Sequence, residues 1–158
     1  NQLFIPVLEQ TSQISSVLLA NDGGKEFLLL RKPREWYNRI TDSTAKTNQL
    51  HILHWRDART LQQDEWQSRD YDPRLRPWYL GAQQLPQDGL LHWTEPYTFY
   101  TTGDAGITVS TRWHDSNGKM WVLAFDVMLS DLSNFTTKLR VGQRGQAAIL
   151  TQSGLVIG

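Results

Sequence analysis

Cysteine is absent from the 158-residue sequence, which excludes disulfide bonds, thiolate metal sites and cysteine nucleophiles. No apolar run approaches the ~20 residues that a membrane-spanning helix requires, and no signal peptide is recognisable. Lys plus Arg equals Asp plus Glu at 16 each, so no net charge favours nucleic acid or an anionic membrane as a partner. The chain starts at Asn1 without Met and stops at Gly158 within a predicted strand, so we expect it to be part of a longer protein.

Large apolar side chains are plentiful. Hydrophobic residues make up 39% of the chain, charged residues 20%, and there are 7 Trp. Disordered chains are poor in such side chains, and this length suits one ordinary domain. The composition therefore predicts a globular fold with its own core.

Apolar runs separated by turn residues predict an antiparallel sheet with helices packed against it, an α+β fold. The expected strands are 17–20, 26–31, 36–40, 49–55, 97–101, 106–113 and 119–128, with a final hairpin at 146–151 and 155–157. We expect helices at 2–16, at about 74–85 and at 129–139, the last with Ser130 as its N-cap. The polar stretch 56–70 is predicted to be a loop.

The segment 70–79, Asp-Tyr-Asp-Pro-Arg-Leu-Arg-Pro-Trp-Tyr, concentrates groups that recognise a planar anion. Its two Pro residues stiffen the backbone, and guanidinium groups bind carboxylates bidentately, with Tyr and Trp as further donors. The same composition permits a bracing role, in which Arg74 and Arg76 pair with nearby Asp residues while the aromatic side chains face the core. Composition alone leaves both interpretations open.

Several strings in order resemble the double Cache (dCache) sensor domains of bacterial transmembrane signalling proteins. They are Tyr-Asp-Pro-Arg-Leu-Arg-Pro-Trp-Tyr at 71–79 with Gly-Ala at 81–82, Trp-Thr-Glu-Pro-Tyr at 93–97, Gly-Ile-Thr-Val-Ser at 106–110, Leu-Ala-Phe-Asp-Val at 123–127, and the stretch 129–139. The resemblance implies a PAS-like fold, a central antiparallel sheet flanked by helices. It also implies a lead-in helix end at 1–16, a membrane-distal module at 17–140 and the truncated start of a membrane-proximal module at 141–158.

The resemblance further implies a function. Domains of this kind sense small molecules on the periplasmic side of the inner membrane and pair as homodimers through flanking helices. Their parent proteins carry a chemoreceptor, histidine kinase, diguanylate cyclase or nucleotide (adenylate) cyclase output, so the fragment itself is a sensor without enzymatic activity or cofactor. The alternative is a structural or dimerisation module of the same type of receptor that binds no ligand.

Members that bind amino acids share a sub-pattern that this sequence matches at Tyr71, Arg76, Trp78, Tyr79, Tyr97 and Asp126. By that resemblance Arg76 and Trp78 bind the α-carboxylate, while Asp126 and the tyrosine hydroxyl groups bind the ammonium group. The sequence departs from the pattern at Phe99, where amino-acid binders often place an acidic residue, and Asp104 or Asp126 would then compensate. Asp126 could equally cap the helix that follows it.

Other site chemistries are weakly supported. A hydrolase would need paired carboxylates such as Glu95 with Asp126 or Asp104, but no nucleophile elbow or phosphate loop accompanies them. His51 and His54 lie three apart on a predicted strand and so point to opposite faces, which disfavours a metal site. An aromatic cage for a quaternary amine would draw on Trp36, Trp55, Trp66, Trp93, Trp113 and Trp121, residues that more often pack in cores.

Overall fold

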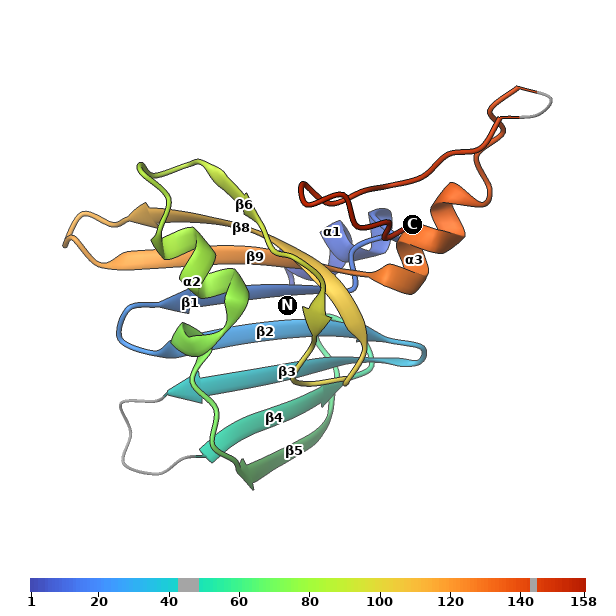
Figure 1. The fold of residues 1–158 in the computed structure, drawn as a ribbon. Coiled ribbons are helices and arrows are strands. Elements are labelled where there is room, and N and C mark those ends of the chain that lie inside the picture. Colours follow the sequence, from blue (N-terminus) through green and yellow to red (C-terminus); the bar gives the residue numbers. More distant parts are fainter. Residues whose placement is uncertain (43–48, 143–144) are drawn as a thin grey trace.

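A computed structural model describes residues 1–42, 49–142 and 145–158. Within them, one antiparallel sheet of nine strands runs in the order β5-β4-β3-β2-β1-β9-β8-β6, with β7 also paired to β8 (Figure 1). The strands are β1 Ser16–Asn21, β2 Lys25–Lys32, β3 Glu35–Asp42, β4 Gln49–Trp55, β5 Leu61–Ser68, β6 Leu91–Trp93, β7 Tyr97–Thr98, β8 Ala105–His114 and β9 Met120–Met128. The helices are α1 Phe4–Gln10, the 3-10 helix η1 Pro73–Leu75, α2 Pro77–Gln83 and α3 Leu129–Thr136. The predicted α+β, PAS-like fold is confirmed.

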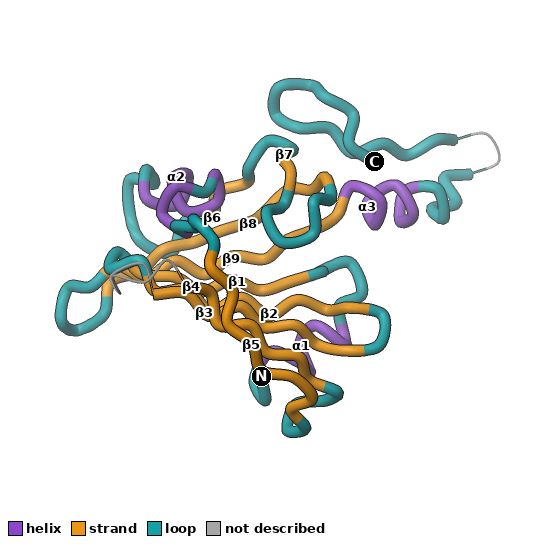
Figure 2. Tube along the Cα trace, turned by 90° about the horizontal axis from the view of Figure 1, so that it is seen from below, coloured by secondary structure: helices purple, strands orange, loops and turns teal. Residues whose placement is uncertain are grey.

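Helices α1 and α2 lie on opposite faces of the sheet (Figure 2). Successive side chains of a strand point to opposite faces, so each face has its own apolar cluster for a helix to pack against. On one face, Trp78 and Ala82 of α2 pack against a cluster that includes Leu18, Leu28 and Val122. On the other face, α1 packs against a separate cluster, with Ile5, Leu8, Val17, Leu29 and Trp36 at its centre. The helix predicted at 2–16 is therefore shorter, Phe4–Gln10, and it covers the face of the sheet opposite α2.

The prediction of a loop over 56–70 was wrong, because the segment contains the edge strand β5. Its sequence Leu-Gln-Gln-Asp-Glu-Trp-Gln-Ser is exposed at most positions, so no apolar alternation marks it. Polar and charged side chains on an edge strand discourage pairing with other chains. Strand β6 was also missed, and β7 ends at Thr98 because Gly103 N–H donates to the Phe99 carbonyl at 2.9 Å, closing a turn.

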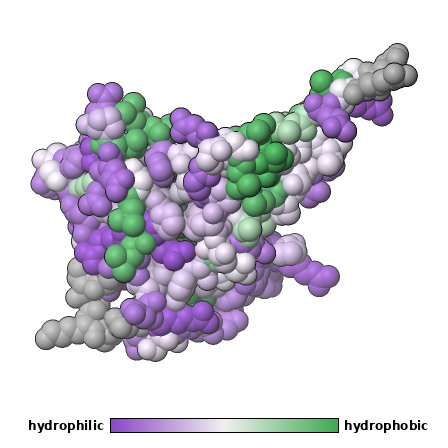
Figure 3. Space-filling model, viewed as in Figure 1, coloured by the Kyte–Doolittle hydropathy of each residue, from purple (hydrophilic) through white to green (hydrophobic). Residues whose placement is uncertain are grey.

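The predicted Ser130 N-cap was also wrong. Helix α3 begins at Leu129, as predicted, and ends at Thr136 rather than at 139; its N-cap position is Met128, whose side chain makes no capping hydrogen bond. The final hairpin is reduced to one bridge between Leu150 and Val156, with Ile149 N–H donating to the Gly158 carbonyl at 2.8 Å. Within this segment Leu155 is 52% exposed, and Figure 3 shows apolar patches on this face of the molecule. No described helix has the length and apolar character needed to cross a membrane.

Gly106 allows β8 to pass closely beneath Phe99. A Cβ atom at this position would lie 2.1 Å from the Phe99 ring and 2.7 Å from the Val127 carbonyl oxygen. We therefore expect Gly106→Ala to lower the free energy of unfolding by about 1–3 kcal/mol, the usual cost of overpacking, in urea titrations. Adding Phe99→Leu should recover part of the loss; no recovery would show that the backbone contact alone limits this position.

Candidate ligand-binding site

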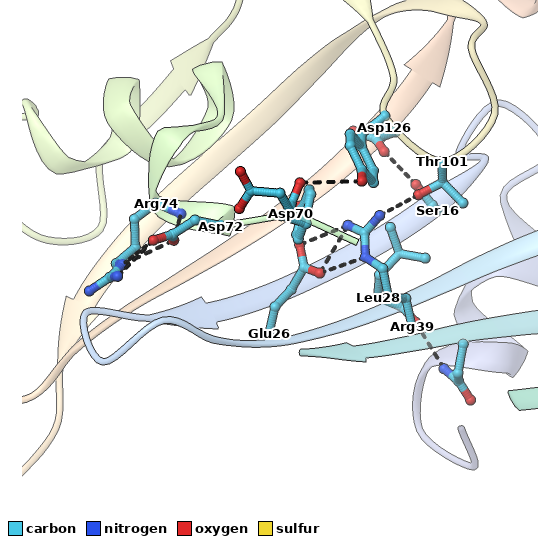
Figure 4. A network of polar contacts seen from close by, with 12 residues as sticks. Ser16, Glu26, Leu28, Arg39, Asp70, Asp72, Arg74, Thr101 and Asp126 are labelled. Carbon is cyan, nitrogen blue, oxygen red and sulfur yellow. Dashed lines mark hydrogen bonds and ion pairs between the residues drawn. The ribbon is translucent and has the colours of Figure 1, made fainter. Parts of the chain in front are cut away.

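The Pro-rich segment 70–79 lies across one face of the sheet, and its two Arg residues have different roles. Asp72 Oδ1 accepts from Arg74 N–H at 2.9 Å, and the Arg74 guanidinium bonds the same carboxylate with a shortest contact of 2.7 Å (Figure 4). Hydrogen bonding from the Arg74 side chain lowers the pKa of Asp72. Arg74 therefore has the bracing role, while Arg76, two residues on, points elsewhere.

A narrow cavity lies between this segment, the sheet and the turn after β7. Its lining residues are Ser16, Leu18, Leu28, Leu30, Arg39, Tyr71, Arg76, Trp78, Tyr97, Phe99, Tyr100, Thr101, Thr102 and Asp126. Five of the six sequence-predicted site residues thus meet around one space, although they come from separate parts of the chain.

Arg76 keeps its charge available on the cavity wall. Its side chain is half-buried, donates to the Thr98 carbonyl at 3.3 Å and lies 5.9 Å from the Tyr97 ring centroid. Among the described residues it forms no ion pair with a carboxylate. Trp78, which is 1% exposed, is anchored by Ser110 Oγ donating to its carbonyl at 2.8 Å. Of the two readings of the segment, anion recognition suits Arg76 better than bracing.

Asp126 supplies a carboxylate to the same cavity. Ser16 Oγ donates to Oδ2 at 2.5 Å and Thr108 Oγ1 donates to Oδ1 at 2.6 Å. Burial raises its pKa to about 6, against the pull of these two donors, which favour the ionised form. The side chain bonds hydroxyl groups on two neighbouring strands rather than amides of α3, so the capping alternative is not realised.

Tyr97 is linked to Asp126 through Thr108. The Tyr97 hydroxyl lies 2.7 Å from Thr108 Oγ1. Because the Thr108 hydrogen goes to Asp126, Tyr97 must be the donor in this contact, which leaves the lone pairs of its own oxygen free. Burial, reinforced by the charge of Asp126, raises the pKa of Tyr97. Its hydroxyl therefore remains neutral and can accept a hydrogen bond from a ligand.

A buried ion pair that sequence reasoning missed lies at the floor of the cavity. Arg39 and Glu26 approach within 2.9 Å, and their side chains are 2% and 0% exposed. Tyr71 donates its hydroxyl to Glu26 Oε1 at 2.6 Å, while its ring lies 3.8 Å from the Arg39 guanidinium carbon. Arg39 also donates to Thr101 Oγ1 at 2.6 Å (Figure 4). The Tyr71 hydroxyl is thus committed to this network, and burial raises its pKa well above the ordinary value.

Tyr79 is the predicted site residue that does not line the cavity. It is 1% exposed, packs edge-on against Trp78 at 5.7 Å between ring centroids, and its hydroxyl has no hydrogen-bond partner in the described part of the chain. Burial raises its pKa to about 12. Phe99, by contrast, does line the cavity and packs edge-on against Tyr97 at 5.3 Å.

The competing site chemistries find little support in the geometry. Neither Glu95 nor Asp104 lines the cavity with Asp126, so the paired carboxylates of a hydrolase are not assembled there. His51 contacts Asp64 at 2.8 Å and His54 contacts Glu35 at 3.0 Å. No group of three metal-ligating side chains occurs among residues 1–42, 49–142 and 145–158. Trp78 alone among the Trp residues borders the cavity, which does not make an aromatic cage.

Comparison with known proteins identifies the kind of domain. The family described as methyl-accepting chemotaxis protein-like, first PDC sensor domain, matches residues 32–134. The chain belongs to this family. It is therefore a sensor domain, a ligand-receiving module and not a catalytic one, and sensor domains of chemoreceptors lie outside the cytoplasm. The predicted kinship with Cache-type sensor domains is confirmed.

Individual relatives agree with this family. The sensor domain is 36% identical over 87 residues to the methyl-accepting chemotaxis protein McpC of Bacillus subtilis, covering 55% of this chain and 13% of McpC. It is 31% identical over 87 residues to adenylate cyclase 1 of Rhizobium meliloti, covering 55% of this chain and 12% of that protein. The ligand-binding domain of the Pseudomonas aeruginosa chemoreceptor PctB, solved with L-Gln, superposes with a TM-score of 0.56 at 21% identity, covering 99% of this chain and 51% of PctB's. The matched segment thus spans about one eighth of McpC and of adenylate cyclase 1, and the chain spans about half of the PctB domain.

Proposed function

We propose that the sensor domain binds a small zwitterion of the amino-acid class in the cavity behind the Pro-rich segment. The observation that carries this proposal is the presence of Arg76 and Asp126 on the walls of one cavity, each free to bind a ligand group of opposite charge. A zwitterion carries both a carboxylate, which pairs with Arg76, and an ammonium group, which pairs with Asp126. One ligand therefore satisfies both charged side chains.

The carboxylate end of the ligand faces Arg76. A guanidinium presents two parallel N–H donors that fit the two oxygens of a carboxylate. Within the described residues, the Arg76 side chain makes a single long hydrogen bond, 3.3 Å to the Thr98 carbonyl, which a ligand can replace at little cost. Trp78 lies beside it as a rigid apolar wall.

The ammonium end faces Asp126 and Tyr97. Asp126 oxygens already accept from Ser16 and Thr108, yet each carboxylate oxygen has a further lone pair. The Tyr97 oxygen contributes an acceptor beside it because its own hydrogen is directed to Thr108. Together they offer an ammonium group partners even though Phe99 stands where an acidic residue is often found.

The neighbouring structures were solved with ligands of the same class. PctB was solved with L-Gln, and the ligand-binding domain of the Pseudomonas fluorescens chemoreceptor CtaA was solved with L-serine. Because these domains are about 21% identical to this chain, they support the fold, and the ligand class rests on the cavity's own charges.

In the whole protein, we propose a homodimer anchored in the inner membrane, in which the ligand favours one signalling conformation by its differential affinity.

A thermal-shift screen against amino acids, amines, carboxylates and purines tests the function. Ligand at 100 times its dissociation constant stabilises by about 2.7 kcal/mol, which raises the melting temperature of a chain of this length by several degrees. Zwitterionic amino acids should give the shift, while matched simple amines and carboxylates should give much less. No shift with any compound would favour the alternative, a structural module that binds no ligand.

Arg76→Ala should abolish the amino-acid shift and leave the melting temperature of the ligand-free domain nearly unchanged. The physical reason is that Arg76 has no carboxylate partner in the described structure, so its loss removes little besides ligand contact. Arg74→Ala is the matched control, because Arg74 lies two residues away and is paired with Asp72; this variant should still bind. Retained binding in Arg76→Ala, with a large fall in stability, would instead assign Arg76 a bracing role.

A further inference from the structure

A second cavity lies next to the first. Its lining residues are Leu30, Lys32, Tyr37, Arg39, Leu50, Gln67, Arg69, Tyr100, Thr101 and Thr102. Half of these, namely Leu30, Arg39, Tyr100, Thr101 and Thr102, also line the first cavity. The hydrogen bond from Arg39 to Thr101 therefore lies in the wall that the two cavities share.

The charge of this second cavity is strongly one-sided. Lys32, Arg39 and Arg69 line it, and no Asp or Glu does. Arg39 is neutralised by Glu26, and Lys32 is partly neutralised by Glu35 at 3.3 Å. Arg69 makes no hydrogen bond or ion pair within the part of the chain that the structure describes.

Two neutral donors accompany the unpaired cation. Gln67 Nε2 donates to Glu65 Oε1 at 2.7 Å. This hydrogen bond occupies the nearby Glu65 carboxylate and fixes the Gln67 amide at the edge of the cavity. Tyr37 borders the same space, and burial raises its pKa, so its hydroxyl stays protonated. A cation with neutral donors beside it and no lining carboxylate is a site for an anionic group.

We propose that this second cavity receives the side chain of the ligand and selects amino acids that carry a second carboxylate, with Arg69 as the specificity-determining residue. The inference rests on the proposed function, in which Arg76 and Asp126 hold the α-carboxylate and the ammonium group. A side chain that extends from there passes Arg39, displaces its bond to Thr101 and reaches Arg69. Neutral amino acids of the same length leave Arg69 without a partner.

Isothermal titration with L-glutamate and L-glutamine tests this selectivity, since the two ligands match in size and differ in side-chain charge. An ion pair with an exposed Arg favours glutamate by about two- to fivefold in affinity. Because Arg69 is exposed, the preference should fall as ionic strength rises. Arg69→Gln should remove this preference by lowering glutamate affinity about two- to fivefold, with glutamine affinity unchanged. Arg59→Gln, at an exposed Arg that lines neither cavity, is the matched control and should change neither.

The outcomes separate the two proposals. Equal affinity for both amino acids in the wild type, or an Arg69→Gln variant that retains the preference, would overturn the second subsite while leaving the zwitterion site intact. An equal loss in Arg59→Gln would show a general effect of surface charge and would also overturn it. If neither amino acid binds, the second subsite fails, while the thermal-shift screen with the other amino acids decides the zwitterion site separately.

Discussion

Asp126→Asn should abolish amino-acid binding while raising the melting temperature of the ligand-free domain at pH 7.5. Burial raises the pKa of Asp126 from 3.8 to about 6, so its ionised form costs stability at neutral pH. A difference of roughly 2 pKa units corresponds to about 3 kcal/mol, or several degrees in a chain of this length. Asn avoids that cost, because Thr108 can still donate to its oxygen while Ser16 turns to accept from its amide.

The stability gain depends on pH in a defined direction. Because the folded pKa of Asp126 is raised, the folded state binds more protons than the unfolded state between about pH 4 and pH 6. The Asp126 contribution to stability is therefore greatest below this window and is lost as pH rises through 6. Melting curves should show the full Asp126→Asn advantage at pH 7.5, about half of it at pH 5, and little of it below pH 4.

Ligand affinity has the opposite dependence on pH. An ammonium group requires the ionised carboxylate, so affinity in the wild type should fall about tenfold for each unit below pH 6. Titration calorimetry at pH 5, 6 and 7.5 measures this slope. An Asp126→Asn variant that binds amino acids as tightly as the wild type would remove Asp126 from the proposed site.

Arg39→Met should cost about 3–5 kcal/mol of unfolding free energy, measured by urea denaturation. The substitution leaves Glu26 as a carboxylate with 0% side-chain exposure whose only remaining donor among its observed partners is the Tyr71 hydroxyl. An unpaired buried charge is far more costly than the loss of the ion pair itself. Adding Glu26→Gln should therefore recover much of the stability, because a neutral amide can be buried with Tyr71 as partner.

The control for this experiment is a surface pair on the same strands. Lys25 and Asp42 approach within 3.2 Å, with side chains 59% and 39% exposed. Lys25→Met should cost less than about 1 kcal/mol, since water screens such pairs. Either of two results would contradict this role of the buried pair. Arg39→Met would lower the free energy of unfolding no more than Lys25→Met does, or the double variant Arg39→Met with Glu26→Gln would be no more stable than Arg39→Met.

The sequence predicted most of the sheet, because runs of apolar residues in β1, β2, β8 and β9 are separated by turn residues. It could not predict β5, whose two faces are both polar. Nor could it pair Glu26 with Arg39, since that contact depends on the register in which β2 meets β3. One clue was available: Glu26 alternates with Leu28 along β2, which places a charge on the buried face.

The position of each side chain in the Pro-rich segment was harder to predict than the presence of the segment. Successive residues of an α-helix point about 100° apart. Trp78 consequently faces the cavity while Tyr79 turns into the core beside it. Arg74 and Arg76 are separated by a different cause. Asp72 forms hydrogen bonds with Arg74 at the start of η1, while Arg76 lies beyond η1 in extended conformation. A family motif identifies the residues, and only the backbone geometry decides which of them contact the ligand space.

Asp126 also joins the ligand cavity to both ends of the domain. Its backbone carbonyl accepts from Ser15 N–H at 2.9 Å, immediately after the segment that follows α1. Three residues further along the chain, α3 begins at Leu129. A displacement of this carboxylate would therefore act, over a few bonds, on the segment that follows α1 and on the start of α3. Both helices lie within reach of one buried side chain.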